Sequence, residues 1–383
     1  MGFWILFFII FSVFVSGCAA PPEENYLNVR TAARNAANTT AEQLKSAGWR
    51  DGAIWVAPAI NRHSGEITAS GRELQVLMAL DLKILLGDAV IQSLGGNEDT
   101  AWDWILAPSV EFEKPTDEKF DTNWFKIHVA VISPRGRTLP GVTLRVNAQQ
   151  FDATPSRFFR DAPLYLTGTY NDIRQEFAKG GNSTVPLEAR NRFIAVEGLI
   201  QEAILNFESG NYRKAIQGFD KVIDKDTENL PALSGRYQSL LEIGKAPEIE
   251  VALIKLIDAA LKQKNISFRF LFQVRSVDFR DDVQITRHYH SWLSQLAKQV
   301  LASGSCLQVR GHASRSGSFE YNNELSYSRA SQVMGLLLKY APGLSGRVSV
   351  EGRGYQDNVV GSGSDDSADA IDRRVDFKLL SCK

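Results

Sequence analysis

The sequence lacks the features that usually identify an enzyme or a nucleic-acid-binding protein. Its 383 residues carry a net charge of −1, whereas nucleic-acid-binding domains usually show a basic excess or a basic stripe, so we predict no nucleic-acid partner. The chain has three cysteines and no metal-spaced set of them, and it contains no nucleophile elbow and no phosphate-binding glycine loop. We therefore predict a protein that is not an enzyme and that needs neither a metal nor another cofactor.

A long apolar run stands near the start of the chain, from Phe3 to Val15. It is shorter than the about 20 residues that a membrane-spanning helix needs, and its length is typical of the core of a signal peptide. The sequence Val15-Ser16-Gly17-Cys18 that ends it resembles a bacterial lipobox. This resemblance implies a signal peptide over residues 1–17, lipidation of Cys18 and a lipidated tether over residues 18–28. An uncleaved anchor with an incidental cysteine is the alternative interpretation.

The other two cysteines, Cys306 and Cys382, stand near the C-terminus. An even number of cysteines in an exported chain suggests a disulfide. We expect Cys306 at the start of one strand and Cys382 at the end of another, and antiparallel neighbours would bring these two ends together. Two buried thiols are the alternative.

Residues 29–186 show the order helix, strand, helix and then three strand-like runs. The helices are predicted over 31–47 and 70–91, the first strand over 53–58, and the three further runs over 102–112, 124–133 and 141–149. This order predicts an α+β domain, a sandwich of helices on a sheet, on which Phe158 to Pro163 are expected to pack. The region loosely resembles the N-terminal module of periplasmic lipoproteins such as penicillin-binding-protein activators and the curli secretion lipoprotein.

Residues 187–264 have a helical pattern throughout. Gly210-Asn211-Tyr212, followed by Ala215, Phe219 and Val222, resembles the turn and second helix of a tetratricopeptide repeat, and Gly244 falls 34 positions after Gly210. Two such repeats are fewer than the about three that normally stand alone, so we expect these hairpins to lean on a neighbouring domain. They form either a helical spacer or a peptide-binding groove.

Residues 266–383 alternate between strand and helix patterns in the order βαβαββ. Strands are expected over 268–279, 306–310, 348–352 and 375–379, and helices over 286–302 and 322–340. Together with Gly311-His312-Ala313-Ser314, the helix start at Asn322 and the segment Asp372-Arg373-Arg374, this order resembles the peptidoglycan-binding domain of the OmpA family. The whole chain is thus predicted to be an α+β multidomain protein with an N-terminal α/β sandwich, α-helical tetratricopeptide-like hairpins and a C-terminal two-layer OmpA-like domain.

The OmpA resemblance implies a set of binding residues. In that family the loop reads Gly-His-Thr-Asp and the helix Asn-x-x-Leu-Ser-x-x-Arg-Ala, and its Asp and Arg hold the diaminopimelate of a peptidoglycan stem peptide. An arginine supplies a forked, permanently charged donor for the carboxylate of that group, and an aspartate offsets its ammonium. The peptidoglycan-binding residues implied here are Ser314, Asn322, Ser326, Arg329, Arg373 and Arg374.

Ser314 stands where the family has an aspartate, and Arg315 follows it. A neutral hydrogen bond to an ammonium is about half as strong as a charge-assisted one. Three interpretations therefore stay open. The domain binds peptidoglycan with a negative charge supplied from elsewhere, it binds a different anionic ligand through Arg315 and Arg329, or it is a structural copy of the fold that docks a protein. The candidates for the substitute charge are Glu324, Asp365 and Asp366.

These features predict a lipoprotein on the periplasmic face of the outer membrane, since Ala19 rather than aspartate after the cysteine is typical, by resemblance, of outer-membrane sorting. The predicted function is to bind or dock near peptidoglycan and so to contribute to cell-envelope integrity. The alternative is a periplasmic scaffold or assembly factor. Its repeats and N-terminal domain would recruit an unknown protein partner, and its OmpA-like domain would not bind peptidoglycan.

Overall fold

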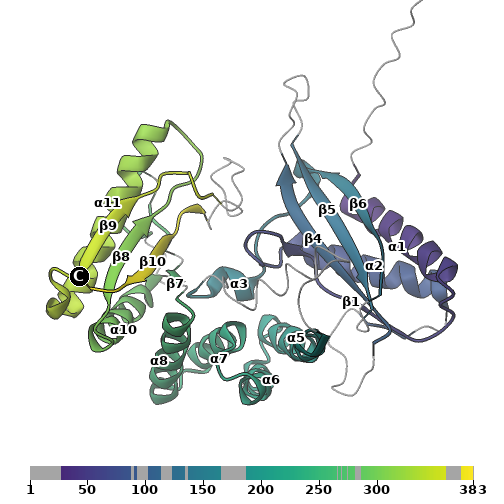
Figure 1. Cartoon of the computed structure of the whole chain (residues 1–383), viewed down its shortest axis with the longest axis horizontal. Helices are drawn as coiled ribbons and strands as arrows, with labels where there is room; N and C mark the ends of the chain where they lie inside the picture. Colours follow the sequence, from purple (N-terminus) through teal and green to yellow (C-terminus); the bar gives the residue numbers. More distant parts are fainter. Residues whose placement is uncertain are drawn as a thin grey trace, which may run out of the picture.

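The structure is a computed structural model that describes residues 27–87, 90–92, 102–113, 123–133, 137–164, 187–264, 266–268, 270–273, 275–280, 286–358 and 372–382. The predicted signal peptide, Cys18, Asp365 and Asp366 lie outside these ranges. Figure 1 shows a sheet-containing unit at each side of the molecule and a layer of helices below and between them. Within the described ranges, none of the helices combines the length and the apolar character that crossing a membrane requires.

The N-terminal unit is a sheet with two helices on one face. Helices α1 (Val29–Ser46) and α2 (Ala69–Leu86) pack against each other (Figure 1). Four fully buried alanines of α1, at positions 32, 33, 36 and 37, lie in the same core as both helices and the sheet. The strands are β1 (Ala53–Val56), β2 (Ile60–Asn61), β3 (Val90–Gln92), β4 (Trp104–Glu113), β5 (Trp124–Ile132) and β6 (Thr138–Asn147). The sheet has the order β3-β1-β4-β5-β6, with β2 paired to β4.

The antiparallel meander β4-β5-β6 agrees with the predicted series of three strands. The predicted helix over 70–91 is wrong at its end, because α2 stops at Leu86 and Gly87 adopts a φ of 66°, a conformation that favours glycine. The following apolar residues pair with β1 in parallel, with Val90 opposite Ala53. Their apolar character therefore continues the helical pattern in the sequence although they belong to an edge strand.

Four helices form the middle of the chain: α5 (Leu187–Glu208), α6 (Tyr212–Lys225), α7 (Leu230–Ile243) and α8 (Ala246–Lys262). Consecutive helices pack against each other, and Gly244, with a φ of 71°, ends α7 in the left-handed conformation. A Cβ atom at Gly235 would overlap the Phe219 ring, so the absence of a side chain lets α6 and α7 approach closely. We call α5 to α8 the helical unit.

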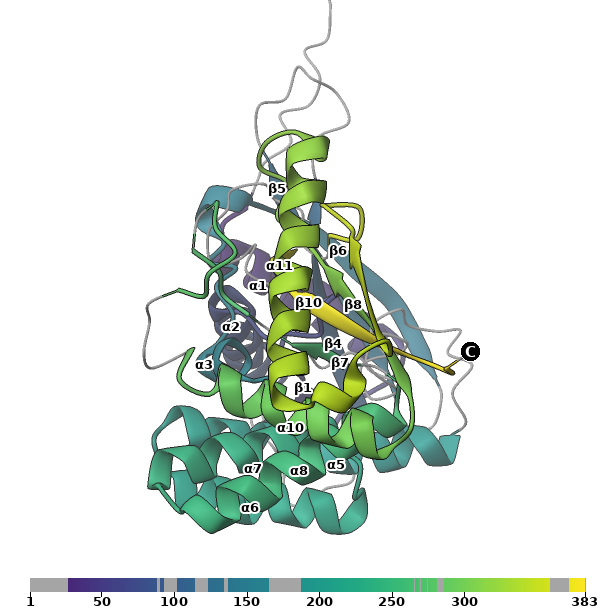
Figure 2. The ribbon, with the colours of Figure 1, turned by 90° about the vertical axis from the view of Figure 1, so that its left-hand side faces the viewer.

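The C-terminal unit is a two-layer domain. Its elements are β7 (Ile266–Phe268), α10 (Tyr289–Ala302), β8 (Cys306–Gly311), α11 (Phe319–Tyr340), β9 (Val348–Gly352) and β10 (Val375–Leu380). The sheet order is β7-β10-β8-β9, with β10 antiparallel to β7 and β8, and β9 parallel to β8. Figure 2 shows α11 lying across this sheet. The predicted βαβαββ order is confirmed.

Two element bounds in this domain differ from the prediction. The first strand is short, and Phe272 pairs back with Phe279 in a hairpin over residues 271–280 instead of extending β7. Helix α11 begins at Phe319, three residues early, because the Ser318 hydroxyl caps it by accepting a hydrogen bond from the Tyr321 amide at 3.2 Å.

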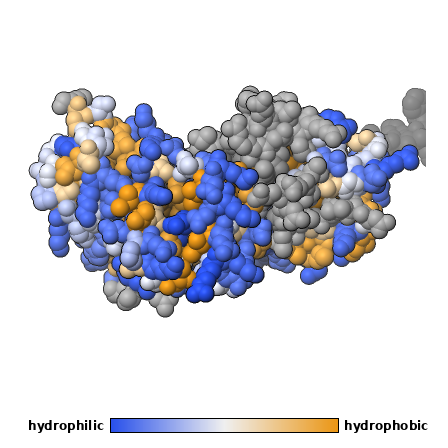
Figure 3. Space-filling model, turned by 90° about the horizontal axis from the view of Figure 1, so that it is seen from below, coloured by the Kyte–Doolittle hydropathy of each residue, from blue (hydrophilic) through white to orange (hydrophobic). Residues whose placement is uncertain are grey.

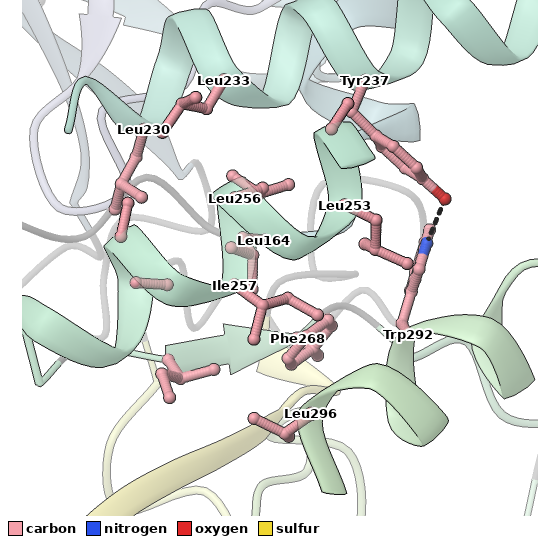
Figure 4. Close-up of a cluster of buried hydrophobic side chains, with 14 of the residues drawn as sticks. Leu164, Leu230, Leu233, Tyr237, Leu253, Leu256, Ile257, Phe268, Trp292 and Leu296 are labelled. Atoms are coloured by element: carbon pink, nitrogen blue, oxygen red, sulfur yellow. Dashed lines mark hydrogen bonds between the residues drawn. The ribbon is translucent and has the colours of Figure 1, made fainter. Parts of the chain in front are cut away.

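The helical unit and the C-terminal domain share one hydrophobic core. Figure 4 shows Ile257 of α8 facing Phe268 of β7 and Leu296 of α10, whereas Leu256 lies toward Leu233 of α7, and all of these side chains belong to one core. In the same view Trp292 donates a hydrogen bond from Nε1 to the Tyr237 hydroxyl of α7 at 2.8 Å. The helical unit therefore packs directly on its neighbour, as its small number of predicted repeats required.

The short helix α3 (Arg157–Asp161) also belongs to this second core. Phe158 and Phe159 are buried there, and the Phe158 ring contacts Phe207 and Phe219 of the helical unit. The segment also contacts the N-terminal unit as predicted, since the same core contains Ile60 and Ile67 and the Ser156 amide donates to the Ile67 carbonyl at 2.8 Å. What the sequence did not show is that the two rings also pack on the helical unit.

Cys306 and Cys382 form a disulfide, as predicted, with their Cα atoms 5.0 Å apart. Cys306 is the first residue of β8 and pairs with Leu380, the last residue of β10. The antiparallel register of these strands therefore brings the two cysteines together, and the bridge closes the sheet at the end remote from Gly311.

Replacing Cys382 with serine is expected to lower the free energy of unfolding by about 2–4 kcal/mol, because the bridge restrains the unfolded chain across a separation of 76 residues. Urea denaturation of the oxidised protein would measure the loss. Reductant should lower the stability of the wild type to that of the variant and leave the variant unchanged. Equal midpoints for the oxidised wild type and the variant would contradict this role.

Candidate functional site

A cavity of about 840 Å³ opens between the 271–280 hairpin, the loop after β8 and the first turns of α11. Its lining residues are Leu271, Phe272, Gln273, Arg275, Arg280, Ala313, Ser314, Ser316, Gly317, Ser318, Tyr321, Asn322, Leu325, Arg329 and Arg373. Four of these residues are arginines, and within the described part of the chain none of them is an aspartate or a glutamate. The cavity therefore presents positive charge together with hydroxyl, amide and aromatic groups.

The loop after β8 starts beside the backbone of α11. A Cβ atom at Gly311 would overlap the Ser326 carbonyl oxygen, so only glycine permits this approach. Next in the loop, His312 is 1% exposed, and its Nε2 lies 2.8 Å from Oδ2 of Asp376. The Ala313 amide donates to the Gly354 carbonyl at 2.8 Å. These contacts hold the loop so that Ser314, which is 4% exposed, lines the cavity.

A buried charged network supports the loop from beneath. Asp376 of β10 accepts a hydrogen bond from Nε of Arg374 at 3.1 Å and contacts both His312 and the Ser267 hydroxyl. Burial alone would raise the pKa of Asp376, but the Arg374 guanidinium, followed by the His312 and Ser267 contacts, brings that pKa well below its ordinary value. Asp376 is therefore ionised throughout the neutral range.

Arg329 fastens the hairpin wall of the cavity to α11. Its side chain is 3% exposed, and it donates from Nε to the Ser276 carbonyl at 3.0 Å and from Nη2 to the Gln273 carbonyl at 3.2 Å. The guanidinium carbon lies 4.7 Å from the centre of the Phe272 ring, within the range of a cation–π contact. Arg329 thus lines the cavity and also fixes the shape of its opposite wall.

Asn322 fixes the other side of the loop. Its Nδ2 donates to the Ser316 carbonyl at 2.7 Å and to the Ser318 carbonyl at 3.0 Å. Ser326, one turn further along α11, accepts a hydrogen bond from the Gly354 amide at 2.9 Å. Asn322 lines the cavity, whereas Ser326 anchors the turn that follows β9.

The structure brings four of the six predicted binding residues to the cavity: Ser314, Asn322, Arg329 and Arg373. The other two, Ser326 and Arg374, are buried and do not line it. Arg374 donates to Asp376 and, at 3.1 Å, to the Asp357 carbonyl. The helical spacing and the arginine pair correctly indicate proximity, but the side chains of Ser326 and Arg374 are directed to supporting contacts.

The structure places two further candidate residues, Glu324 and Arg315, away from the cavity lining. Glu324 is exposed and does not line the cavity, because a residue two positions after Asn322 points to another side of the helix. Arg315 is also outside the lining, and its guanidinium carbon lies 5.9 Å from the centre of the Tyr355 ring. Both residues therefore lie outside the described lining of the cavity.

Arg275 and Arg280 are lining residues that the sequence analysis missed. They stand on the hairpin, where Arg275 has a φ of 56°, a conformation uncommon for a residue with a side chain. The signal in the sequence was one arginine on each side of the segment Ser276 to Phe279. It gave no prediction because the region was read as one continuous strand, which would point its residues to alternate faces.

The model of the OmpA family matches residues 280–372, whereas no curated protein matches the chain. Among solved structures, an outer membrane protein of Borrelia burgdorferi B31 has 22% identity and a TM-score of 0.24, with 30% of this chain and 88% of that chain covered. The peptidoglycan-associated lipoprotein of Burkholderia pseudomallei has 25% identity and a TM-score of 0.25, with coverages of 31% and 92%. The periplasmic domain of Helicobacter pylori MotB has 16% identity and a TM-score of 0.25, with coverages of 31% and 85%. The family match and the βαβαββ order together identify residues 280–372 as an OmpA-family domain.

Proposed function

We propose that the protein is a lipid-anchored lipoprotein of the outer membrane that binds peptidoglycan stem peptides in the cavity of its OmpA-family domain. The observation that carries the proposal is the arginine-lined cavity, built on the family's own helix motif with Arg329 as a lining residue. The lipobox at Cys18 supports the lipid anchor. Binding the cell wall from a membrane anchor would contribute to envelope integrity.

The lining chemistry suits an acidic peptide. A stem peptide carries carboxylates, and guanidinium groups bind carboxylates with two parallel hydrogen bonds. Arg275, Arg280 and Arg373 stand at more exposed positions than Arg329, so they are the groups that a ligand would meet first. The Phe272 and Tyr321 rings offer apolar contacts for the carbon chain between the ligand's polar groups.

Removing Arg329 should greatly weaken retention on the cell wall. Arg329→Ala deletes one of four cationic groups and frees the Gln273 and Ser276 carbonyls that hold the hairpin wall. Loss of charged hydrogen bonds worth about 1.5–3 kcal/mol corresponds to roughly a tenfold or greater loss of affinity. The measurement is sedimentation of the full mature protein with purified sacculi.

The matched control is Arg315→Ala, because Arg315 lies in the loop after β8, next to Ser314, but does not line the cavity. This variant should sediment like the wild type. Circular dichroism would establish that both variants are folded, and Arg373→Ala provides a second cavity variant. Wild-type protein that sediments no better than Arg329→Ala would overturn peptidoglycan binding. A stable protein partner that co-purifies with it in that case would support the scaffold function instead.

Among the described side chains of the helical unit, few large apolar groups are exposed. Seen from below, the coloured part of the surface mixes hydrophilic with apolar side chains (Figure 3). Val251 and Ile254 of α8 are 51% and 37% exposed, and isolated apolar residues of this kind are normal on soluble domains. The cavity therefore remains the better supported binding site.

A further inference from the structure

We propose that the exposed face of helix α2 lies on the phospholipid surface to which the chain is anchored, so that the membrane contacts the folded N-terminal unit as well as the lipid at Cys18. This inference rests on the lipid anchor of the proposed function. It adds an interaction surface in a part of the chain that is remote in sequence from the cavity.

A row of apolar side chains runs along the exposed face of α2. Val76, Leu80 and Ile84 are 40%, 55% and 79% exposed, and their spacing of four residues places them on one face of the helix. We call these three residues the apolar row. On the other side of α2, Leu74 and Met78 are fully buried in the core that the helices form with the sheet. The protein core therefore accounts for only one of the two apolar faces of α2.

The apolar row differs from the other exposed apolar residues in its continuity. Val251 and Ile254 on α8 form only a pair, and both are less exposed than Ile84. Scattered apolar residues need no partner, but contiguous ones indicate a contact surface. A helix with a buried apolar face and a second, exposed apolar face is suited to lie between a protein core and a membrane surface.

The predicted lipid anchor can reach this face. Leu27 pairs with Val146 of β6 and is followed directly by α1, which packs against α2. Residues 18–26 span at most about 32 Å when fully extended. Helices α1 and α2 have 18 residues each and are therefore about 27 Å long. A lipid on Cys18 and the apolar row can thus reach the same membrane surface.

Charged side chains beside the apolar row suit a phospholipid surface. The exposed charged residues of the two helices are Arg30, Arg34, Lys45 and Lys83 together with Glu42 and Glu73. Long basic side chains can lay their carbon chains along apolar surface while the charged ends reach lipid phosphates. Figure 1 shows α1 and α2 toward the opposite end of the molecule from the C-terminal domain. Membrane contact through α2 would therefore leave that domain away from the lipid.

A second copy of the chain fits the apolar row less well. A stable dimer interface involves about 20–30 residues on each partner, many more than the three residues of the row. A shallow lipid contact needs only one face of a helix. Combined with acylation, it would give the membrane a second point of attachment, and stable anchoring takes more than one such signal.

The test measures flotation of the full mature chain with vesicles of phosphatidylcholine and phosphatidylglycerol. The protein carries Cys18→Ser, so that no acyl group contributes. It should float with the vesicles, and the further changes Leu80→Gln and Ile84→Gln should lower its partition coefficient about tenfold or more, because two apolar side chains no longer enter the lipid. The matched control is Val251→Gln with Ile254→Gln, which removes the exposed pair of α8 and should leave flotation unchanged.

Circular dichroism would establish that all variants are folded. Failure of the Cys18→Ser protein to float, or equal flotation with and without the apolar row, overturns the inference. A dimer in analytical ultracentrifugation that the Leu80→Gln, Ile84→Gln change converts to a monomer, with no effect on flotation, assigns the face to a second copy and overturns it too. The proposed function fails separately, through lost sedimentation with sacculi or through mass spectrometry that finds Cys18 without lipid in the native protein.

Discussion

Replacing Trp292 with alanine is expected to lower the free energy of unfolding by about 3–5 kcal/mol, the usual range for a buried tryptophan. Trp292 is 4% exposed, its ring lies beside Phe268 of β7, and its Nε1 donates to Tyr237 of α7. The side chain thus joins the C-terminal domain to the helical unit. The variant should therefore destabilise the C-terminal domain and the helical unit together.

Urea denaturation would give the free energy, and hydrogen exchange read by mass spectrometry would show where protection is lost. Peptides from α5 to α8 and from α10 to β10 should lose protection to a similar extent. Trp292→Phe keeps an apolar ring but leaves the Tyr237 hydroxyl without this donor, so it should cost only about 1 kcal/mol. Lost protection confined to one of the two parts would contradict the shared core.

Replacing Asp376 with asparagine is expected to cost about 3–5 kcal/mol, because it removes the carboxylate to which the buried Arg374 guanidinium donates. The loop that carries Ser314 should lose order as well, since His312 contacts the same carboxylate. Chemical denaturation at neutral pH would measure the stability. The matched variant is Asp278→Asn, an exposed aspartate on the hairpin that should change stability little.

The same pair of proteins gives a pH test. The pKa of Asp376 in the folded protein is well below its ordinary value, burial being outweighed by Arg374 and His312. Its contribution to stability is therefore complete above the unfolded-state pKa of about 3.9 and is lost as pH falls through the folded-state pKa. Between about pH 5 and pH 2.5, wild type should lose stability more steeply than Asp376→Asn. If the stabilities of the two proteins fell in parallel with pH, the pKa of Asp376 would not be lowered in the folded protein.

Much of the C-terminal domain could be predicted from the sequence because its helices and strands each follow a clear period. Leu293, Leu296 and Val300 mark one face of α10, and Leu307 and Val309 alternate along β8. The disulfide could be predicted for the same reason, since the strand order sets its geometry. A regular hydrophobic pattern reports which residues face a core.

The parts that were missed depend on contacts between segments distant in the sequence. The hairpin over 271–280 turns at Arg275, a residue that gives no turn signal of its own, and it is held by Arg329 from a helix more than 50 positions away. The roles of Ser326 and Arg374 depend on the partners Gly354 and Asp357. A sequence motif indicates which residues lie near a site, but the direction of each side chain depends on the partners that the fold brings to it.

The bridge between Leu164 and Phe268 has a mechanical consequence. Leu164 ends the described part of the N-terminal region, and Phe268 pairs in turn with Val375 of β10. In the anchored and wall-bound state that we propose, tension on the chain would therefore pass from Leu164 through this bridge into the C-terminal sheet. The helical unit, inserted between two residues that touch, would remain outside the line of force and keep its shape while the tether is loaded.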